Sequence, residues 1–359
     1  MNISYGQAIN LALTEEMRRN KRLVCFGLGV NDSLKFFGTT KGLEKKFGSQ
    51  RVFETPTSEN AMTGIGIGMS LYKNPCVMMH QRLDFFLLAM DQLVNSAAKW
   101  HYMFGGQKSI PITIRLIVGK GWGQGPTHSQ SLQSWFAHIP GLKVVMPSLP
   151  SDAYNLLKDS IRDPNPVIFI EHRWLHGSEE KKITKEKNKI GQSKLLSIGK
   201  DFTVVTYSLS TLEMLTIKKT LNKQNIFFDH VDLRTIKPLD MKIIKRSLNK
   251  TQKLLVLDTI SHPICSIGSE IISQISQDKS IKLSKQPLLI TLPDVPSPTG
   301  TFYTKDFYVS KKNILPLTKL LESLFKSRSM NYSLMSLLID LPSKSSLENL
   351  LKDSDPIDN

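Results

Sequence analysis

Glu59 is of a residue type that can move protons in a catalytic site. It stands at the predicted start of a helix, within the segment ETPTSENAMTG of residues 54–64, directly after the candidate cap Ser58. A carboxylate in an apolar pocket can share a proton with a heterocyclic ring nitrogen, because desolvation raises its pKa. An acidic residue here would also stabilise the helix dipole without any catalytic role. The local pattern leaves both interpretations open.

His128 is the second candidate, and it ends a glycine-rich loop. The loop GKGWGQG of residues 119–125 continues as PTHSQS before a predicted helix. Glycine-rich loops occur where backbone approaches a ligand, and histidine exchanges protons near neutral pH. A loop histidine bonded to its neighbours is the alternative. His138 lies in an apolar stretch (FAHIPG) and is predicted to be a buried, hydrogen-bonded histidine.

Motifs for other cofactors are absent from the sequence. The glycines of residues 64–68 (GIGIG) fall inside a predicted helix and lack the spacing of a dinucleotide-binding loop, so they are predicted to allow close helix packing. The phosphate loop GxxxxGK[ST] and the HExxH and CxxC metal patterns do not occur. Cys25, Cys76 and Cys265 are widely spaced, and the first two are predicted to be buried thiols.

Short apolar runs alternate with helical patterns along the first half of the chain. This alternation predicts a mainly parallel sheet covered by helices on both faces. The predicted strands are residues 23–27, 76–79, 112–118, 144–146 and 167–170, and the predicted helices are residues 5–20, 60–72, 85–102 and 152–161.

A second α/β series follows a polar, lysine-rich stretch. Its predicted strands are residues 203–207, 226–232, 254–258 and 288–292, and its predicted helices are residues 211–223, 240–248 and 266–275. A chain of 359 residues suits two domains. We therefore expect a first domain at 1–180, a linker at 181–199, a smaller second domain at 200–326 and a C-terminal extension at 327–359.

The net charge of +16 raises the question of a nucleic-acid partner. The densest basic cluster, at positions 181, 182, 185, 187 and 189, lacks interleaved aromatic residues and is predicted to be a solvated linker. The first thirty residues do not resemble a signal peptide, and no apolar run reaches the roughly 18 to 20 residues of a membrane span. We expect a cytoplasmic protein with no nucleic-acid or membrane partner.

Several segments together resemble one family, the β subunits of the thiamine diphosphate-dependent decarboxylase component of 2-oxo acid dehydrogenases (pyruvate and branched-chain types), within the transketolase-like group. In order and spacing the resemblance covers about residues 3–325, and it implies a transketolase-like pyrimidine-binding domain followed by a transketolase C-terminal domain. The segments are the one around Glu59 and residues 91–99 (DQLVNSAAK), 127–131 (THSQS), 136–145 (FAHIPGLKVV), 161–167 (IRDPNPV), 231–240 (VDLRTIKPLD) and 294–296 (DVP).

The resemblance implies roles for four residues around the cofactor. Glu59 matches the glutamate that bonds the aminopyrimidine ring and promotes its imino form. Phe85 matches the aromatic that packs on the pyrimidine, and Gln81 matches a pocket residue of the branched-chain members. His128 matches the histidine near the thiazolium, which is implicated in proton transfer and in passing on the acyl group.

The family also divides its cofactor between two subunits. The diphosphate and magnesium belong to a separate α subunit, and this sequence lacks their signature of Gly-Asp-Gly with a distant Asn. The resemblance therefore implies two α and two β chains, a β chain inactive alone, and a lipoyl-bearing acyltransferase as acceptor. It also implies a structural potassium site, for which a turn rich in Asp, Pro and Asn is the alternative. Its positions are Ile112, Ser160, Ile161, Asp163 and Asn165.

The implied reaction is oxidative decarboxylation of a 2-oxo acid with acyl transfer to lipoamide. Residues 81–85 (QRLDF) differ from the sequence typical of the pyruvate enzymes at this place. Residues 171–174 (EHRW) keep the acidic residue of the family but follow it with bulky polar side chains. The sequence therefore leaves the identity of the substrate open. Two alternatives remain at this point. One is a split transketolase-like enzyme that transfers a ketol unit between sugars, and the other is a noncatalytic interaction protein with the same fold.

Overall fold

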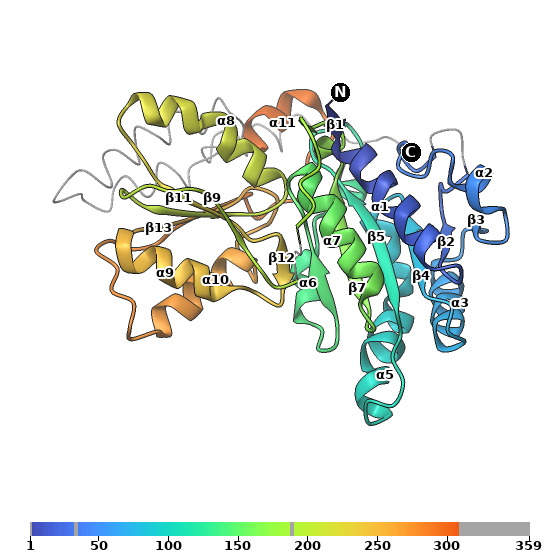
Figure 1. Cartoon of the computed structure of the whole chain (residues 1–359). Helices are drawn as coiled ribbons and strands as arrows, with labels where there is room; N and C mark the ends of the chain where they lie inside the picture. The colour runs from blue at the N-terminus through green and yellow to red at the C-terminus, as the bar shows by residue number, and fades with distance from the viewer. Residues whose placement is uncertain (1, 32–34, 187–189, 309–359) are drawn as a thin grey trace, which may run out of the picture.

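The computed structural model describes residues 2–31, 35–186 and 190–308, which form two α/β halves side by side, each built on its own sheet (Figure 1). The C-terminal extension expected at 327–359 lies outside the described residues, as do Lys187 and Lys189 of the predicted linker. No helix in the described ranges is long and apolar enough to cross a membrane.

The first half contains a seven-stranded sheet with the strand order β12-β6-β7-β5-β4-β2-β3. Every pairing from β6 to β3 is parallel, which confirms the predicted mainly parallel sheet. All residues of β5 are buried, as expected for a central parallel strand covered on both faces. The strands are β2 (Val24–Gly27), β3 (Val52–Glu54), β4 (Cys76–His80), β5 (Ile112–Val118), β6 (Lys143–Val145), β7 (Val167–His172) and β12 (Thr235–Lys237).

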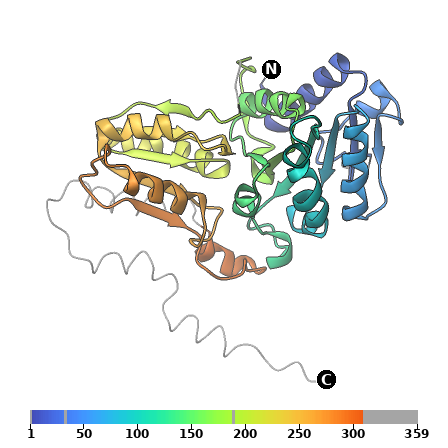
Figure 2. The same cartoon turned by 90° about the horizontal axis from the view of Figure 1, so that it is seen from below.

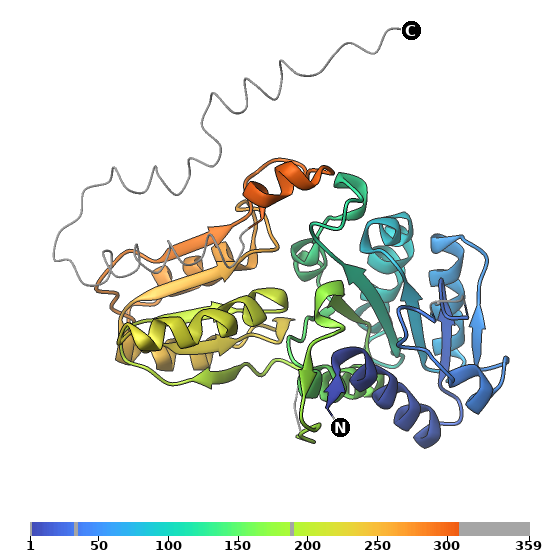
Figure 3. The same ribbon diagram turned by 90° about the horizontal axis from the view of Figure 1, so that it is seen from above.

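Helices cover both faces of this sheet, and Figure 3 shows α1 and α7 on one face with α3 and α5 on the other. A short pairing of β1 (Ile3–Ser4) with β8 (Glu179–Glu180) ties the start of the chain to the end of the first half. The helices are α1 (Tyr5–Arg19), α2 (Leu43–Phe47), α3 (Glu59–Leu71), α4 (Leu83–Phe86), α5 (Ala98–Met103), α6 (Gln133–His138) and α7 (Pro150–Arg162).

The predicted single helix at 85–102 is wrong in detail. The chain forms α4, then a 3-10 turn at Leu87–Ala89, a π-helical stretch at Gln92–Ala97 and finally α5. Such π segments insert an extra residue into the helical repeat, and apolar periodicity alone does not reveal them.

The glycine pattern in α3 has a packing role at one position, as predicted. A Cβ atom on Gly66 would lie 2.8 Å from Ile112 Cδ1 and 3.2 Å from Phe26 Cζ, so a larger residue would push the helix off the sheet. The space beside Gly68 is open. Cys25 and Cys76 are buried as predicted, and burial raises the pKa of each thiol to about 12.

The second half contains a five-stranded sheet with the order β14-β13-β10-β11-β9, in which only β9 is antiparallel to its neighbour. Figures 1 and 2 show α8 on one face and α9 and α10 on the other. The elements are β9 (Lys194–Ser197), β10 (Thr203–Thr206), α8 (Leu209–Lys223), β11 (Asp229–Asp232), α9 (Met241–Thr251), β13 (Leu254–Asp258), α10 (Ile267–Gln277), β14 (Leu288–Thr291) and α11 (Thr301–Phe307).

One strand connects the two halves. β12 belongs to the second half of the chain but pairs antiparallel with β6 of the first sheet. Just before β12, Arg234 donates to the Asp152 carboxylate at 2.9 Å, and Asp152 is on α7. Asp232 is fully buried beside this pair and accepts a bond from Ser148 at 3.0 Å. Burial and the charge of Asp152 raise the pKa of Asp232 to about 7.

This buried acid predicts a pH-dependent effect of Asp232→Asn on stability. An unfolded aspartate titrates near pH 4, so between about pH 4 and 7 the folded protein holds a proton that the unfolded chain has released. The wild type therefore loses stability as pH rises through this window, whereas the amide variant does not. We expect the thermal midpoint of Asp232→Asn, relative to wild type, to rise by several degrees between pH 4 and pH 8. A pH-independent difference would contradict a protonated Asp232.

Candidate active site

The carboxyl edge of the first sheet collects the polar segments singled out above. The adjacent parallel strands β4, β5 and β7 end at this edge, since parallel strands point the same way. Residues 81–85 follow β4, the glycine-rich loop 119–125 follows β5, and residues 173–174 follow β7. Ligands of open parallel sheets bind beyond the carboxyl ends of the strands, so this edge is the candidate active site.

The structure brings two of the predicted residues, Phe85 and His128, into direct contact. Their ring centroids lie 5.1 Å apart with the planes at 89°, an edge-to-face pair. Phe85 is 42% exposed, so part of its side chain remains accessible. His128 ends a 3-10 turn, and its Nδ1 lies 2.9 Å from Thr127 Oγ1. This contact leaves Nε2 as the ring nitrogen for an external proton donor or acceptor.

Two amide side chains fasten the glycine-rich loop to residues 81–85. Gln124 Oε1 accepts bonds from the Arg82 guanidinium at 2.9 and 3.1 Å. Gln130 donates to Asp84 Oδ1 from its backbone at 3.1 Å and from its side chain at 3.0 Å. Burial raises the pKa of Asp84, and the two bonds from Gln130 oppose that rise. His128 is therefore held between two points where its loop is anchored.

Glu59 is the first residue of α3, as predicted, and only 7% of its surface is exposed. Ser58 occupies the N-cap position, but its side chain makes no capping hydrogen bond. Within the described part of the chain no hydrogen bond or ion pair joins the Glu59 carboxylate to another side chain, or its side chain to the Phe85–His128 pair. The Glu59 side chain is thus largely buried and has no hydrogen-bond partner among the described residues, which suits a ligand nitrogen.

Gln81 follows β4 and lies against the backbone of Gly29. A Cβ atom on Gly29 would stand 2.1 Å from Gln81 Nε2, so only glycine leaves space for the amide. Gly29 also has φ +80°, a conformation that L side chains rarely adopt. The Glu54 carboxylate accepts from the amides of Gly29 (2.5 Å) and Asn31 (2.9 Å), which holds this turn in place. The loop after β2 therefore packs closely against the Gln81 side chain.

A buried ion pair stands behind this edge, and sequence reasoning missed it. Arg115 of β5 donates to the Glu171 carboxylate of β7 at 2.6 and 2.9 Å, and both side chains are fully buried. His176 Nε2 lies 3.0 Å from the same carboxylate. Burial alone would raise the pKa of Glu171, but Arg115 and His176 hold it at about 2. An arginine in the middle of an apolar strand was the signal available in the sequence.

His80, at the end of β4, is a second residue that the sequence analysis missed. It is 1% exposed, and neither ring nitrogen has a hydrogen-bond partner in the described structure. Its ring packs on Phe86 with centroids 4.8 Å apart. Burial lowers the pKa of His80 to about 3, so the ring is neutral at physiological pH. Gln81 therefore follows a neutral, apolar-packed side chain rather than a charged one.

Of the residues predicted to hold potassium, one has an acceptor oxygen free for a cation and another has its charge already paired. The Asp163 carboxylate accepts from Lys143 Nζ at 2.5 Å and from the Asn165 amide at 2.9 Å, so its charge is already paired. Asn165 Oδ1 is buried without a hydrogen-bond partner, an acceptor that a cation would satisfy. The remaining positions are Ile112 at the start of β5, and Ser160 and Ile161 in the last turn of α7.

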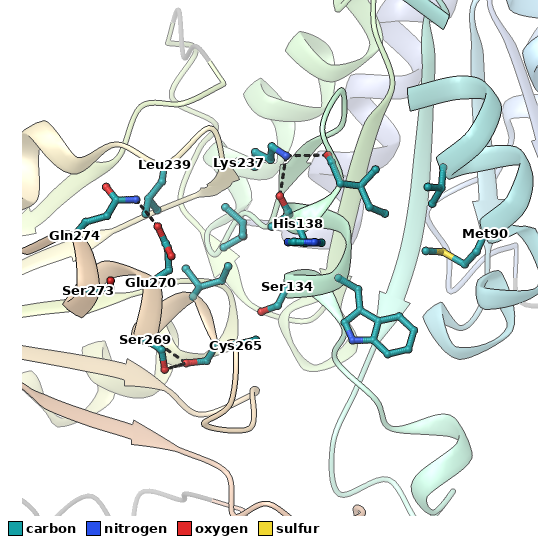
Figure 4. A pocket seen from close by; sticks show the side chains of 17 residues that line it. Met90, Ser134, His138, Lys237, Leu239, Cys265, Ser269, Glu270, Ser273 and Gln274 are labelled. Carbon is teal, nitrogen blue, oxygen red and sulfur yellow. Dashed lines mark hydrogen bonds between the residues drawn. The ribbon is translucent and has the colours of Figure 1, made fainter. Parts of the chain in front are cut away.

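A separate cavity of about 1120 Å³ lies between the two halves, lined by residues of α6, β12 and α10 among others (Figure 4). His138 lines it and is exposed, so the prediction of a buried histidine was wrong: the residue ends α6, where the chain leaves the apolar core. Lys237 borders the cavity and donates to the carbonyls of Ala137 (2.7 Å) and Ile139 (2.8 Å). None of the four predicted cofactor residues lines this cavity.

Two family models match the amino-acid sequence. The transketolase pyrimidine-binding domain matches residues 1–177, and the transketolase C-terminal domain matches residues 191–314. Among solved structures, the chain resembles one described as a split-gene transketolase, inactive beta4 tetramer, with a TM-score of 0.73, 18% identity and coverage of 90% of this chain and 100% of the other. At that identity the likeness concerns the fold alone.

Curated relatives are more similar in sequence. The acetoin:2,6-dichlorophenolindophenol oxidoreductase subunit beta of Cupriavidus necator is 38% identical over 82% of this chain and 90% of its own length. The 2-oxoisovalerate dehydrogenase subunit beta of Bacillus subtilis is 36% identical over 87% and 96%. The pyruvate dehydrogenase E1 component subunit beta of Rhizobium meliloti is 36% identical over 81% of this chain, which spans only 64% of that relative.

The buried Arg115–Glu171 pair predicts that replacing Arg115 alone lowers the free energy of unfolding much more than replacing both residues. Arg115→Met should lower the free energy of unfolding by about 3 to 5 kcal/mol, because Glu171 stays buried without its counter-ion. Arg115→Met combined with Glu171→Leu should recover most of that loss, since no isolated charge remains. Chemical denaturation followed by tryptophan fluorescence measures both. Lys245→Met, which removes an ion pair with Asp278 at a more exposed site, is the control and should change stability little. Equal losses in the single and double variants would contradict this account.

Proposed function

Because this chain belongs to the transketolase-like family of 2-oxo acid dehydrogenase β subunits, we propose that it is the β subunit of a thiamine diphosphate-dependent enzyme of this kind. The proposed reaction is oxidative decarboxylation of a 2-oxo acid with transfer of the acyl group to lipoamide. Two observations support the proposal: the contact of Phe85 with His128 at the carboxyl edge of the sheet, and the buried Glu59 side chain, without a hydrogen-bond partner among the described residues, at the start of α3, the helix that follows β3. The relatives are named as dehydrogenase or oxidoreductase subunits, which favours this reaction over ketol transfer or a noncatalytic role.

The first proposed role is that of Glu59, which would hold the aminopyrimidine ring. A desolvated carboxylate with no protein partner gains most by sharing a proton with a ring nitrogen. Its position at the start of α3 fixes its direction, since the backbone there is helical from Glu59 onward. When bound, thiamine diphosphate supplies the nucleophilic carbon for decarboxylation. The chain's contribution at this point is to place one proton acceptor and exclude water.

The other proposed roles concern packing and proton transfer around the reacting groups. The exposed part of Phe85 would offer an apolar surface for the pyrimidine ring, and the Gln81 amide, packed against Gly29, would lie beside it. His128, oriented through its Nδ1 contact with Thr127, would move a proton at Nε2 during decarboxylation or acyl transfer. Anchoring of the loop by Gln124 and Gln130 keeps that nitrogen in position.

We also propose that the catalytic centre is completed by an α subunit. The sequence lacks the Gly-Asp-Gly and distant Asn that hold diphosphate and magnesium in the family, so those groups would be held by the partner. The proposed assembly has two α and two β chains, and the β chain alone should not turn over substrate. The proposed acyl acceptor is the lipoyl-bearing acyltransferase of the same complex.

Glu59→Gln tests the catalytic proposal directly. In the complex reconstituted with the α subunit, we expect the variant to lose at least about a hundredfold in 2-oxo acid decarboxylation, measured with an artificial electron acceptor, because its amide cannot accept the proton. Its thermal midpoint should stay close to that of wild type. Glu44→Gln is the matched control, since Glu44 is an exposed acid in the first turn of α2 and should keep full activity.

Two results would contradict the proposal. Full activity of Glu59→Gln would remove the carboxylate from the chemistry. Turnover by the isolated wild-type chain, with thiamine diphosphate and magnesium added, would refute the shared site. Turnover of ketose phosphates but of no 2-oxo acid would favour the split transketolase alternative.

A structural potassium site is the other element of this proposal, and salt exchange tests it. The unpartnered Asn165 oxygen predicts that the thermal midpoint of the wild type is higher in potassium chloride than in choline chloride at equal ionic strength. Asn165→Ala removes that ligand and should unfold at the same temperature in both salts. Equal midpoints for the wild type would favour a simple Asp-Pro-Asn turn.

A further inference from the structure

Two guanidinium groups that no catalytic role has used lie at the carboxyl edge of the first sheet. Arg82 follows β4 and Arg173 follows β7, the two neighbours of β5. Both stack on the same ring: their Cζ atoms lie 5.7 Å and 4.8 Å from the centroid of Phe37, which limits their separation to 10.5 Å at most. Arg82 also lies 4.4 Å from the Trp122 ring centroid. The aromatic rings hold two like charges near each other.

No carboxylate neutralises this pair in the described part of the chain. The arginines that form ion pairs there are Arg19, Arg115, Arg162 and Arg234. Arg82 donates only to neutral oxygens, those of Gln124 and of the Gln81 carbonyl. Burial lowers the pKa of both guanidinium groups; at Arg82 the nearby Asp84 opposes this and the charge of Arg173 adds to it.

Lys120 shows the contrast, because it follows β5 between the two arginines and is paired. Its ammonium group lies 2.7 Å from the Glu213 carboxylate of the second half. Among the described residues, the fold therefore pairs the central cation with a carboxylate and leaves the two flanking arginines without an ion pair, with Asp84 as a nearby charge at Arg82. Two partly buried like charges repel, and an anion bound between them relieves that repulsion. Arginine is also the residue best shaped for bidentate binding of carboxylate or phosphate.

Both arginines border the catalytic residues. Arg82 is the N-cap residue of α4, the helix that carries Phe85, and Gln124 links it to the loop that carries His128. Arg173 is followed by Trp174, whose indole nitrogen donates to the Lys120 carbonyl of the same loop at 2.6 Å. An anion on the guanidinium pair would thus lie beside the substrate site rather than on a remote surface.

We propose that Arg82 and Arg173 form an anion subsite that selects 2-oxo acids carrying a second acidic group, a carboxylate or a phosphate, at the end remote from the keto acid. This inference rests on the proposed function and adds the class of substrate to it. Phe37 is a positioning residue in this scheme, since it acts by holding both guanidinium groups. Because both arginines belong to the β chain, the preference for this class of substrate is determined by the β chain.

A matched substrate pair tests the subsite in the complex with the α subunit. 2-Oxoglutarate and 2-oxovalerate have five carbons each and differ in the distal carboxylate. We expect wild-type kcat/KM to be at least tenfold higher for 2-oxoglutarate or for a 2-oxo acid with a distal phosphonate, and comparing those two separates carboxylate from phosphate. Arg173→Gln should raise KM for the preferred dianionic substrate at least tenfold and leave kcat for 2-oxovalerate within twofold. Arg82→Gln should raise the same KM at least tenfold, and it also removes the guanidinium bonds to Gln124 that anchor the loop of His128.

Controls separate recognition from a general loss of structure. Arg173→Lys keeps the charge and should restore part of the loss in KM, whereas Arg18→Gln, at an exposed arginine of α1, should behave as wild type. The artificial electron acceptor keeps lipoamide out of this assay, so an effect seen only with lipoamide would assign the pair to the acceptor and overturn the proposal. A wild-type preference for 2-oxovalerate would overturn it too, as would equal losses on both substrates.

Direct binding distinguishes failure of the subsite from failure of the proposed reaction. Trp122 and Trp174 lie at the site, so glutarate or 3-phosphonopropionate should change the tryptophan fluorescence of the purified chain in a saturable way, and butyrate should not. The Arg82→Gln/Arg173→Gln double variant should show no response. Saturable binding without turnover of any 2-oxo acid would retain the subsite and reject the dehydrogenase function. No saturable response to either dianion in wild type would reject the subsite.

Discussion

The ion pair between Arg115 and Glu171 is the constraint on which the candidate site depends. Removing both charges from water is costly, and their attraction offsets that cost only when every donor and acceptor is placed accurately. Here Nη2 of Arg115, which also donates to Glu171, donates to Thr39 Oγ1 at 3.1 Å, and Nη1 donates to Met79 Sδ at 3.6 Å. The guanidinium carbon lies 4.9 Å from the centroid of Phe36. Lys35, Phe36 and Phe37 adopt positive φ values of 50°, 47° and 57°, a conformation unfavourable for L residues that surrounding contacts must maintain. One buried pair therefore fixes β5, β7 and the loop after β2 relative to one another.

Those three elements carry the groups to which function is assigned. β5 leads to the loop with His128, β7 leads to Arg173, and the loop after β2 presents Phe37. The second half supplies a further restraint on the His128 loop, because Lys120 pairs with Glu213, and Gln133 donates to Tyr207 at 2.8 Å. Tyr207 in turn donates to the buried Asp258 at 2.5 Å. The position of His128 is thus determined from both halves, although the proposed catalytic residues all come from the first.

Much of this arrangement could be predicted from the sequence, since local patterns specify local structure. The β5 and β13 strands have the predicted limits, and α3 begins at Glu59, directly after the candidate cap Ser58. What failed or was missed involves contacts between residues distant in the chain. The pairing of β12 with the first sheet, the exposure of His138 and the Arg115–Glu171 pair have no local periodic signal. In the sequence, the segments around Arg82 and Arg173 stand out only as differences from the residues typical of the family. The two arginines come together on Phe37 only in the folded chain.

The nature of decarboxylation limits what the guanidinium pair can usefully bind. A 2-oxo acid loses its own carboxylate charge as carbon dioxide departs, so a cation bound to that carboxylate stabilises the ground state more than the transition state and slows the step. A distal acidic group keeps its charge throughout, and binding it stabilises both states equally while fixing the orientation of the substrate. Two arginines without an ion pair among the described residues are therefore compatible with the proposed decarboxylation only if they bind a group that does not react. The second acidic group of the proposed substrate would therefore lie at the arginines, with its keto acid towards His128.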